Sequence, residues 1–499
     1  MTDLKAIARG IFRETLAAID VADSVKSALG RSGTLCRVGE CEFDLCDFPR
    51  VAVIAVGKAA APMASGMIAA LPQDVSPTGL LVVPAKPWNN LPGIRTIVAG
   101  HPVPNEASFE AGSAALELLA ACGKDTLVFF LLSGGGSALV EKPFFSDVTL
   151  GHMQELNRVL VTCGAPIDDI NAVRKHVSAV KGGRLAAAAP EALKITLGVS
   201  DVPPGKESAL ASGPTLPDPT RISDALRVAR QYGIAEKLSG PLRRRIEKGD
   251  LPETPKEGDR AFGRAHFHLV LGMNQMFHCA HRFAEASGCV TVCDNTTDDW
   301  PVERARDFLL EQLDRLAHQH PGKRVCVIAN GEVLSKVTGD GVGGRNSAFV
   351  LACVEKIAGK PIAVLSAGTD GIDGNSPAAG AVADGTTLER ARRAGMDPED
   401  FFRRSDAYNF FSYLEDAIVT GPTGNNLRDL RILICAPGGE EGEKVESKTG
   451  LNAENAEAKA PRFPELREPW GTQIQLPHRG AKPKGCATRR SEFRPAARR

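Results

Sequence analysis

The chain has 499 residues, of which 43% are hydrophobic and 24% are charged. Because one hydrophobic core rarely serves more than about 300 residues, this length predicts at least two globular domains. The 60 basic and 60 acidic residues cancel. This balance gives no electrostatic case for a nucleic-acid or membrane partner, and it favours a small-molecule substrate.

The N-terminal residues predict an amphipathic helix, because Leu4, Ile7, Ile11 and Phe12 recur on one helical face. Charged residues interrupt this segment, so it does not resemble an export signal. No stretch approaches the roughly 18 uninterrupted apolar residues of a transmembrane helix, and we expect a cytoplasmic protein. The 12 cysteines are scattered through apolar runs, which predicts buried thiols rather than a zinc site.

Short apolar runs alternate with longer helical patterns along the chain, which predicts an α/β fold. The predicted strands are 51–56, 79–83, 126–132, 193–199, 268–271, 290–292, 325–329 and 362–365, and a helix is predicted at 59–70.

The charged, proline-containing segment 247–260 predicts a linker between an N-terminal domain, 1–246, and a C-terminal domain, 261–434. Residues 435–499 have few apolar runs. We therefore expect this tail to be mostly disordered.

A glycine-rich loop follows the strand-like run that ends near Asn330, and it leads through Gly343 and Gly344 to Arg345 and a predicted helix. Glycine lets the backbone approach an anion, and the start of a helix presents N–H groups toward it. This pattern predicts a grip on phosphate or carboxylate. Residues 339–344 also fit G-x-G-x-x-G, which keeps a nicotinamide-dependent reductase as an alternative, whereas no Walker A sequence is present.

Other loops follow predicted strands, which is where α/β folds bind ligands. Lys58 follows the first strand, where it would meet a phosphate as a mobile charge or simply be a solvated lysine at a helix start. The run Ser133, Gly134, Gly135, Gly136 and Ser137 follows the most apolar strand. Its backbone and hydroxyl groups suit phosphate, and a tight turn is the alternative.

Two further loops carry carboxylates. Asp201 comes just after the strand 193–199, where it would bind Mg²⁺, accept a hydroxyl proton or form an Asx turn. Asp370 lies among glycines in the loop 366–376, which is equally consistent with a ligand loop and a solvated turn.

Together these loops resemble the glycerate 2-kinase family, two-domain kinases whose C-terminal portion is called the MOFRL domain. The matching runs are 56–59, 99–105, 132–138, 173–184, 200–202, 213–215, 343–346, 368–374 and 420–424. The resemblance implies an α/β protein with a Rossmann-like N-terminal domain and a smaller α/β MOFRL-type C-terminal domain. It also implies an active site in the cleft between them.

The implied reaction transfers the γ-phosphoryl group of ATP to the 2-hydroxyl of D-glycerate with Mg²⁺, and it gives 2-phosphoglycerate and ADP. A hydroxypyruvate reductase using NAD(P)H is the alternative. The protein would be a monomer or a homodimer.

The resemblance also suggests roles for single residues. Lys58 and Arg345 would be catalytic, and Asp201 would bind the metal or accept the proton. We assign the substrate and its phosphate groups to Ser133, Gly134, Gly135, Gly136, Ser137, Lys175, Arg184, Gly343, Gly344 and Asp370.

Overall fold

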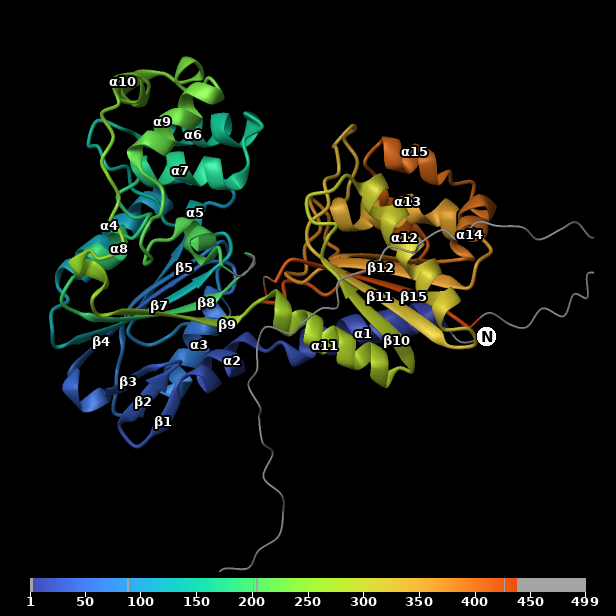
Figure 1. Ribbon diagram of the computed structural model, residues 1–499, viewed down its shortest axis with the longest axis horizontal. Helices are drawn as coiled ribbons and strands as arrows, with labels where there is room; N and C mark the ends of the chain where they lie inside the picture. The colour runs from blue at the N-terminus through green and yellow to red at the C-terminus, as the bar shows by residue number, and fades with distance from the viewer. Residues whose placement is uncertain (1–2, 88, 201, 203–204, 426, 438–499) are drawn as a thin grey trace, which may run out of the picture. The chain divides into compact units, whose positions relative to one another are not determined.

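The computed structural model describes residues 3–87, 89–200, 202, 205–425 and 427–437. Two six-stranded sheets, each covered by helices on both faces, dominate this part of the chain (Figure 1). The predicted α/β fold is therefore confirmed. The last strand ends at Cys435, one residue beyond the predicted end of the C-terminal domain, and the predicted tail from 438 onward lies outside the described residues.

The first sheet is entirely parallel, in the order β6-β5-β4-β7-β8-β9. Its strands are β4 (Arg50–Val56), β5 (Thr78–Val83), β6 (Ile94–Val98), β7 (Thr126–Ser133), β8 (Leu193–Val199) and β9 (Ala265–Leu271). Every residue of β7 is buried, as expected for a central strand covered on both faces. The five predicted strands of this sheet are confirmed, and β6 had not been predicted.

Alternate residues of β4 pack against opposite layers. Val53 and Ala55 face the core that contains α3 (Ala60–Ala70), while Ala52 and Ile54 face the core that contains α4 (Glu106–Ala120). The remaining elements around this sheet are α2 (Val21–Ala28), β1 (Gly30–Ser32), β2 (Leu35–Val38), β3 (Cys41–Asp44), α5 (Gly136–Leu139) and α8 (Arg184–Ala187).

A group of helices with its own hydrophobic core stands beside this sheet (Figure 1). It comprises α6 (Leu150–Thr162), α7 (Ile167–Val177), α9 (Ile222–Gln231) and α10 (Gly240–Lys248). Leu156, Val173 and Val228 meet in that core. These helices matter for function because α6 and α7 line a cavity described below.

The second sheet is mixed, in the order β10-β11-β15-β12-β13-β14. Its strands are β10 (Cys289–Asp294), β11 (Arg324–Asn330), β12 (Ile362–Gly368), β13 (Gly380–Asp384), β14 (Ala417–Ile418) and β15 (Asp429–Cys435). The predicted strands at 290–292, 325–329 and 362–365 are confirmed. The last strand, β15, inserts antiparallel between β11 and β12, so it starts at the edge where those two strands end.

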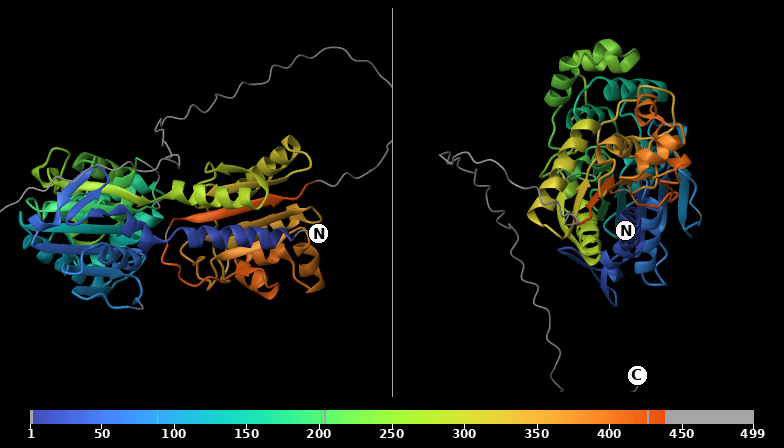
Figure 2. Two further views of the ribbon diagram at one scale, coloured as in Figure 1. Left: turned by 90° about the horizontal axis from the view of Figure 1, so that it is seen from below. Right: turned by 90° about the vertical axis from the view of Figure 1, so that its right-hand side faces the viewer.

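Helices cover both faces of the second sheet. On one side lie α1 (Leu4–Ala18) and α11 (Met273–Ala286), and on the other lie α12 (Val302–Gln319) and α13 (Arg345–Ile357). Figure 2 shows α1, in blue, alongside the strands of this sheet. The remaining helices are α14 (Thr387–Arg393), α15 (Pro398–Arg403) and α16 (Ala407–Tyr413).

The chain passes between the two sheets after α1 and again after β9, which leads directly into α11. Neither crossing falls in the segment 247–260 that the sequence predicts as a linker. The predicted domain limits, 1–246 and 261–434, therefore do not separate the residues of the first sheet from those of the second. They stay predictions about which parts of the chain fold as units. Among the described helices none is long and apolar enough to cross a membrane. The cytoplasmic location and the oligomeric state also stay predictions.

Candidate active site

The turn after β4 brings Lys58 against the glycine-rich turn after β7. The backbone N–H of Lys58 donates to the Gly134 carbonyl (3.0 Å), and that of Ala59 donates to Ser133 Oγ (3.0 Å). Because β4 and β7 are adjacent parallel strands, their following loops meet at one edge of the sheet. The structure therefore places Lys58 beside the Ser133–Ser137 loop.

Only glycine fits at position 57. Gly57 has a φ of 129°, and a Cβ built there would lie 2.2 Å from Ser133 Oγ. We expect Gly57→Ala to lower the free energy of unfolding by about 2–4 kcal/mol, because it adds a steric overlap to backbone strain. Thermal denaturation measures the loss, and kcat should fall with it because Lys58 must shift.

Gly164→Ala is the matched control for this prediction. Gly164 also has a positive φ, of 79°, but a Cβ there would meet no atom within 4 Å. The free energy of unfolding of that variant should fall by only about 1–2 kcal/mol. Equal losses in the two variants would show that the contact with Ser133 costs nothing.

The hydroxyl groups of the glycine-rich turn already have partners within the protein. Ser133 is fully buried, and its Oγ accepts from the Ala59 N–H. Ser137 Oγ lies 2.6 Å from Ser212 Oγ. The backbone of Gly134, Gly135 and Gly136 therefore remains the better candidate for phosphate contacts, which stay a prediction.

The side chain of Lys58 forms an ion pair with Asp370, which follows β12 of the second sheet. Lys58 Nζ lies 2.9 Å from Asp370 Oδ2, and Asp370 Oδ1 accepts from the Ile372 N–H (3.1 Å). The two side chains are 30% and 19% exposed. The pair is accessible enough for a ligand to reach and rearrange it.

Arg345, the first residue of α13, is held by two carboxylates. Its Nε donates to Asp429 Oδ2 (2.7 Å), and its Nη2 lies 2.6 Å from Glu332 Oε1. Burial lowers the pKa of Arg345, but Asp429 and Glu332 outweigh burial and raise this pKa overall. The guanidinium is therefore a fixed, permanently charged group.

The two ion pairs are neighbours. The position of a Cβ on Gly368 lies 3.0 Å from Asp370 Oδ1 and 3.4 Å from Asp429 Oδ1. Gly368 is the last residue of β12 and pairs with Asp429, the first residue of β15. Lys58 and Arg345 are thus brought to one region through adjacent carboxylates.

The start of α13 is capped by a buried carboxylate. Asp373 accepts from the Asn346 N–H (2.9 Å), the Ser347 N–H (2.8 Å) and Ser347 Oγ (2.6 Å). Burial raises the pKa of Asp373, and these hydrogen bonds only partly offset it. Two of the helix N–H groups that the sequence offers to an external anion are therefore occupied. Anion binding at Gly343 and Gly344 stays a prediction.

Arg431 anchors the start of the loop that contains Gly343 and Gly344. It is fully buried on β15, donates to the Gly331 carbonyl (2.6 Å) and lies 5.3 Å from the centre of the Phe349 ring. Burial lowers its pKa to about 10. It therefore supports this loop from within the core.

His101 borders the Lys58 region. A Cβ built on Gly135 would lie 3.1 Å from His101 Cδ2 and 3.4 Å from Lys58 Cγ. Burial, and then the Lys58 ammonium, lower the pKa of His101, while Asp370 partly offsets them. The imidazole is therefore uncharged at neutral pH. Asn105 fixes this segment, because its Oδ1 accepts from the N–H groups of Gly100 and Ser108.

Two predicted substrate-binding residues have partners elsewhere. Lys175 is buried and lies 3.1 Å from Asp218 Oδ1. Burial raises the pKa of Asp218, but Lys175 and Thr220 outweigh burial and lower it overall. Arg184 donates to the carbonyls of Pro252 and Glu253 and lies over the Phe144 ring. Substrate binding by Lys175 and Arg184 stays a prediction that these contacts do not favour.

Asp201, the predicted metal ligand, lies outside the described residues. Within the described part of the chain, no cluster of three or more His, Cys, Asp or Glu side chains is arranged to hold a metal ion. The sequence analysis missed Asp429 and did not assign Glu332, Asp373 or His101 to the site. Asp429 directly precedes the apolar run 430–434. This position indicates a site residue only if β15 is known to run antiparallel to its neighbours, because its first residue then lies where those strands end.

Known proteins resemble this chain along most of its length. A family model described as a domain of unknown function (DUF4147) matches residues 7–247, and the MOFRL family model matches residues 325–429. D-glycerate 2-kinase of Thermotoga maritima is 34% identical over 386 residues, which cover 77% of this chain and 90% of that protein.

A putative hydroxypyruvate reductase of Agrobacterium vitis is 36% identical over 392 residues, which cover 77% of this chain and 87% of that protein. The crystal structure of a glycerate kinase from Thermotoga maritima superposes with a TM-score of 0.74 at 32% identity. It covers 87% of this chain and 99% of its own.

Proposed function

Because this chain belongs to the glycerate 2-kinase family, we propose that it transfers the γ-phosphoryl group of ATP to the 2-hydroxyl of D-glycerate. The products are 2-phosphoglycerate and ADP. The observation that carries the proposal is the pair of cations, Lys58 and Arg345, each held by one of two adjacent carboxylates.

Phosphoryl transfer needs positioning and positive charge more than covalent chemistry from the protein. Arg345 is fixed by Asp429 and Glu332, so its charge is in place before the substrates arrive. The backbone of Lys58 is held by its hydrogen bond to the Gly134 carbonyl. Its flexible side chain would move from Asp370 to a phosphoryl oxygen. Together they would stabilise the charge on the migrating group.

The carboxylates fit a metal ion that arrives with ATP. Magnesium in such enzymes is bound by one or two carboxylates together with phosphate oxygens, so Asp370, once Lys58 has moved, would hold the ion with the phosphates without a preformed cluster. The ion would neutralise charge on the phosphates. Alternatively, Asp370 would accept the proton of the substrate hydroxyl once Lys58 has moved to the phosphate.

The direct test measures ADP release with a coupled assay across D-glycerate, hydroxypyruvate, tartronate and tartrate. We expect turnover that requires both D-glycerate and Mg²⁺, with NMR placing the phosphate on the 2-position. ADP release at the same rate without any acceptor would contradict a glycerate kinase.

A hydroxypyruvate reductase is the second candidate, because a similar protein carries that putative name. The G-x-G-x-x-G match at 339–344 does not support it. In a dinucleotide-binding unit, the strands before and after the helix are parallel neighbours and the helix start holds pyrophosphate. Here β15 lies between β11 and β12 and separates them, and Asp373 occupies the start of α13. NADH or NADPH oxidation on adding hydroxypyruvate would establish the reductase.

A further inference from the structure

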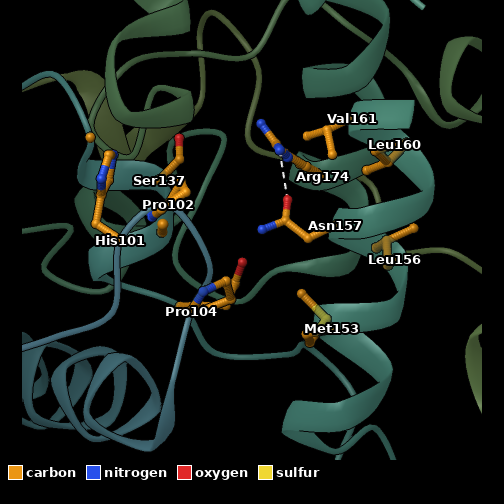
Figure 3. A pocket seen from close by; sticks show the side chains of 13 residues that line it. His101, Pro102, Pro104, Ser137, Met153, Leu156, Asn157, Leu160, Val161 and Arg174 are labelled. Carbon is orange, nitrogen blue, oxygen red and sulfur yellow. Dashed lines mark hydrogen bonds between the residues drawn. The ribbon is translucent and has the colours of Figure 1, made fainter. Parts of the chain in front are cut away.

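A cavity of about 220 Å³ lies between the helices α6 and α7 and the loops beside Lys58 (Figure 3). His101 and Ser137 line one side, whereas Asn157 and Arg174 line the opposite side. The cavity has an apolar wall as well, to which Met153, Leu156 and Leu160 of α6 contribute.

The cavity borders the proposed reaction centre. Gly135 is part of its wall, and a Cβ on Gly135 would lie within 3.4 Å of both His101 and the Lys58 side chain. A small ligand that fills the cavity next to His101 would therefore present one end toward Lys58. Its other end would reach toward Arg174.

The charge of Arg174 is compensated only in part among the described residues. One terminal nitrogen donates to Asn157 Oδ1 (2.6 Å), a neutral acceptor, and none of the described carboxylates forms an ion pair with Arg174. Burial lowers the pKa of Arg174, and Glu141 offsets it only in part. A partly buried guanidinium of this kind is stabilised by a bound anion.

Glu141 also lines the cavity, but it is already neutralised by other groups. Its Oε1 accepts from Ser178 Oγ (2.6 Å) and the Lys142 N–H (2.9 Å), and its Oε2 accepts from Lys181 Nζ. Glu141 therefore leaves the guanidinium of Arg174 available to a ligand.

We propose that Arg174, oriented by Asn157, binds the carboxylate of the hydroxy acid that accepts the phosphoryl group. This inference rests on the proposed kinase function. One planar guanidinium matches one carboxylate in a forked pair, and the apolar wall offers no further cation for a nucleotide tail. The sequence analysis gave this role to Lys175 and Arg184, which the structure pairs with other groups.

Kinetics of Arg174→Ala and Arg174→Gln test the assignment. We expect kcat/KM for D-glycerate to fall by about 100-fold, the loss of a charge-assisted hydrogen bond, while KM for ATP changes by less than about 2-fold. Arg158→Ala is the matched control, because Arg158 is exposed on α6 next to Asn157. A rise in KM for ATP with KM for glycerate unchanged would assign Arg174 to the nucleotide and overturn the proposal.

An uncharged substrate analogue separates carboxylate binding from a structural role. The wild-type protein should prefer D-glycerate to glyceramide, and Arg174→Gln should lose most of that preference. If the variant lowers turnover of both substrates equally, Arg174 does not recognise the carboxylate.

Ligand-induced thermal stabilisation separates this proposal from the proposed function. D-glycerate should raise the melting temperature of the wild-type protein and not that of Arg174→Gln. An inactive wild type that shows this difference would contradict the kinase and leave the carboxylate site standing. Equal shifts in both proteins, or no shift in either, would overturn the site.

Discussion

Replacing Lys58 with alanine should lower kcat for glycerate-dependent ADP formation by about 1,000-fold. The reason is electrostatic, because removal of one preorganised charge or donor at a developing anion typically costs a factor of about 10²–10³. Lys58→Arg should recover only part of the rate, since a planar guanidinium does not reach the same point as an ammonium. A coupled ADP assay at saturating ATP and D-glycerate measures both variants.

The fold should survive this substitution. The ion pair between Lys58 and Asp370 is partly exposed, and pairs of this kind contribute only about 0–1 kcal/mol to stability. The melting temperature should therefore change little. Lys124→Ala is the matched control, because Lys124 is exposed just before β7, at the opposite edge of the same sheet. A folded Lys58→Ala protein with wild-type kcat would exclude Lys58 from catalysis.

The grouping of Lys58 with the Ser133–Ser137 loop could be predicted in part from local sequence. Both loops follow continuous apolar strands, and parallel strands deliver their following loops to the same edge. The glycines in these loops mark close backbone contacts, as the packing of Gly57 against Ser133 shows. The local pattern therefore places both loops at the same end of a sheet, whereas the adjacency of β4 and β7, which are separated in the chain by β5 and β6, could not be predicted from it.

The role of Asp429 could not be predicted in the same way. The rule that ligands lie beyond strand ends draws attention to residues after a strand, whereas Asp429 begins one. It reaches the site because β15 runs antiparallel to β11 and β12. The paired residues are 100–110 positions apart for β11 and 61–73 positions apart for β12, and no periodicity in the apolar run 430–434 reveals this pairing. The packing of α1 against the second sheet was hidden for the same reason.

The motif 173–184 predicted that this segment lies near the site, but it did not predict which face of the helix α7 borders the cavity. Adjacent residues on an α-helix point about 100° apart. Lys175 therefore turns to Asp218, while its neighbour Arg174 lines the cavity. Composition and motif matching treat both as basic residues in the same run, and only the helix orientation distinguishes them.

The second large effect is expected at Arg345. Arg345→Ala should lower kcat by about 1,000-fold, because it removes a fixed charge that we propose lies beside the migrating phosphoryl group. Unlike the Lys58 variant, it should also destabilise the protein. The Asp429 side chain is only 4% exposed, and a buried carboxylate without its cation is costly. Arg345 itself is 39% exposed, so water offsets part of that cost. We therefore expect the free energy of unfolding to fall by about 1–3 kcal/mol.

A double variant separates the two roles of Arg345. In Arg345→Ala/Asp429→Asn the uncompensated carboxylate is gone, so the melting temperature should recover most of its loss, whereas kcat should stay low. Asp429→Asn alone should keep more activity than Arg345→Ala, because the guanidinium retains Glu332. Recovery of both stability and kcat in the double variant would show that Arg345 only neutralises Asp429. If Arg345 is catalytic, the double variant should recover stability but not kcat. Removing the uncompensated carboxylate restores the fold, but it does not replace the cation that the transferring phosphoryl group needs.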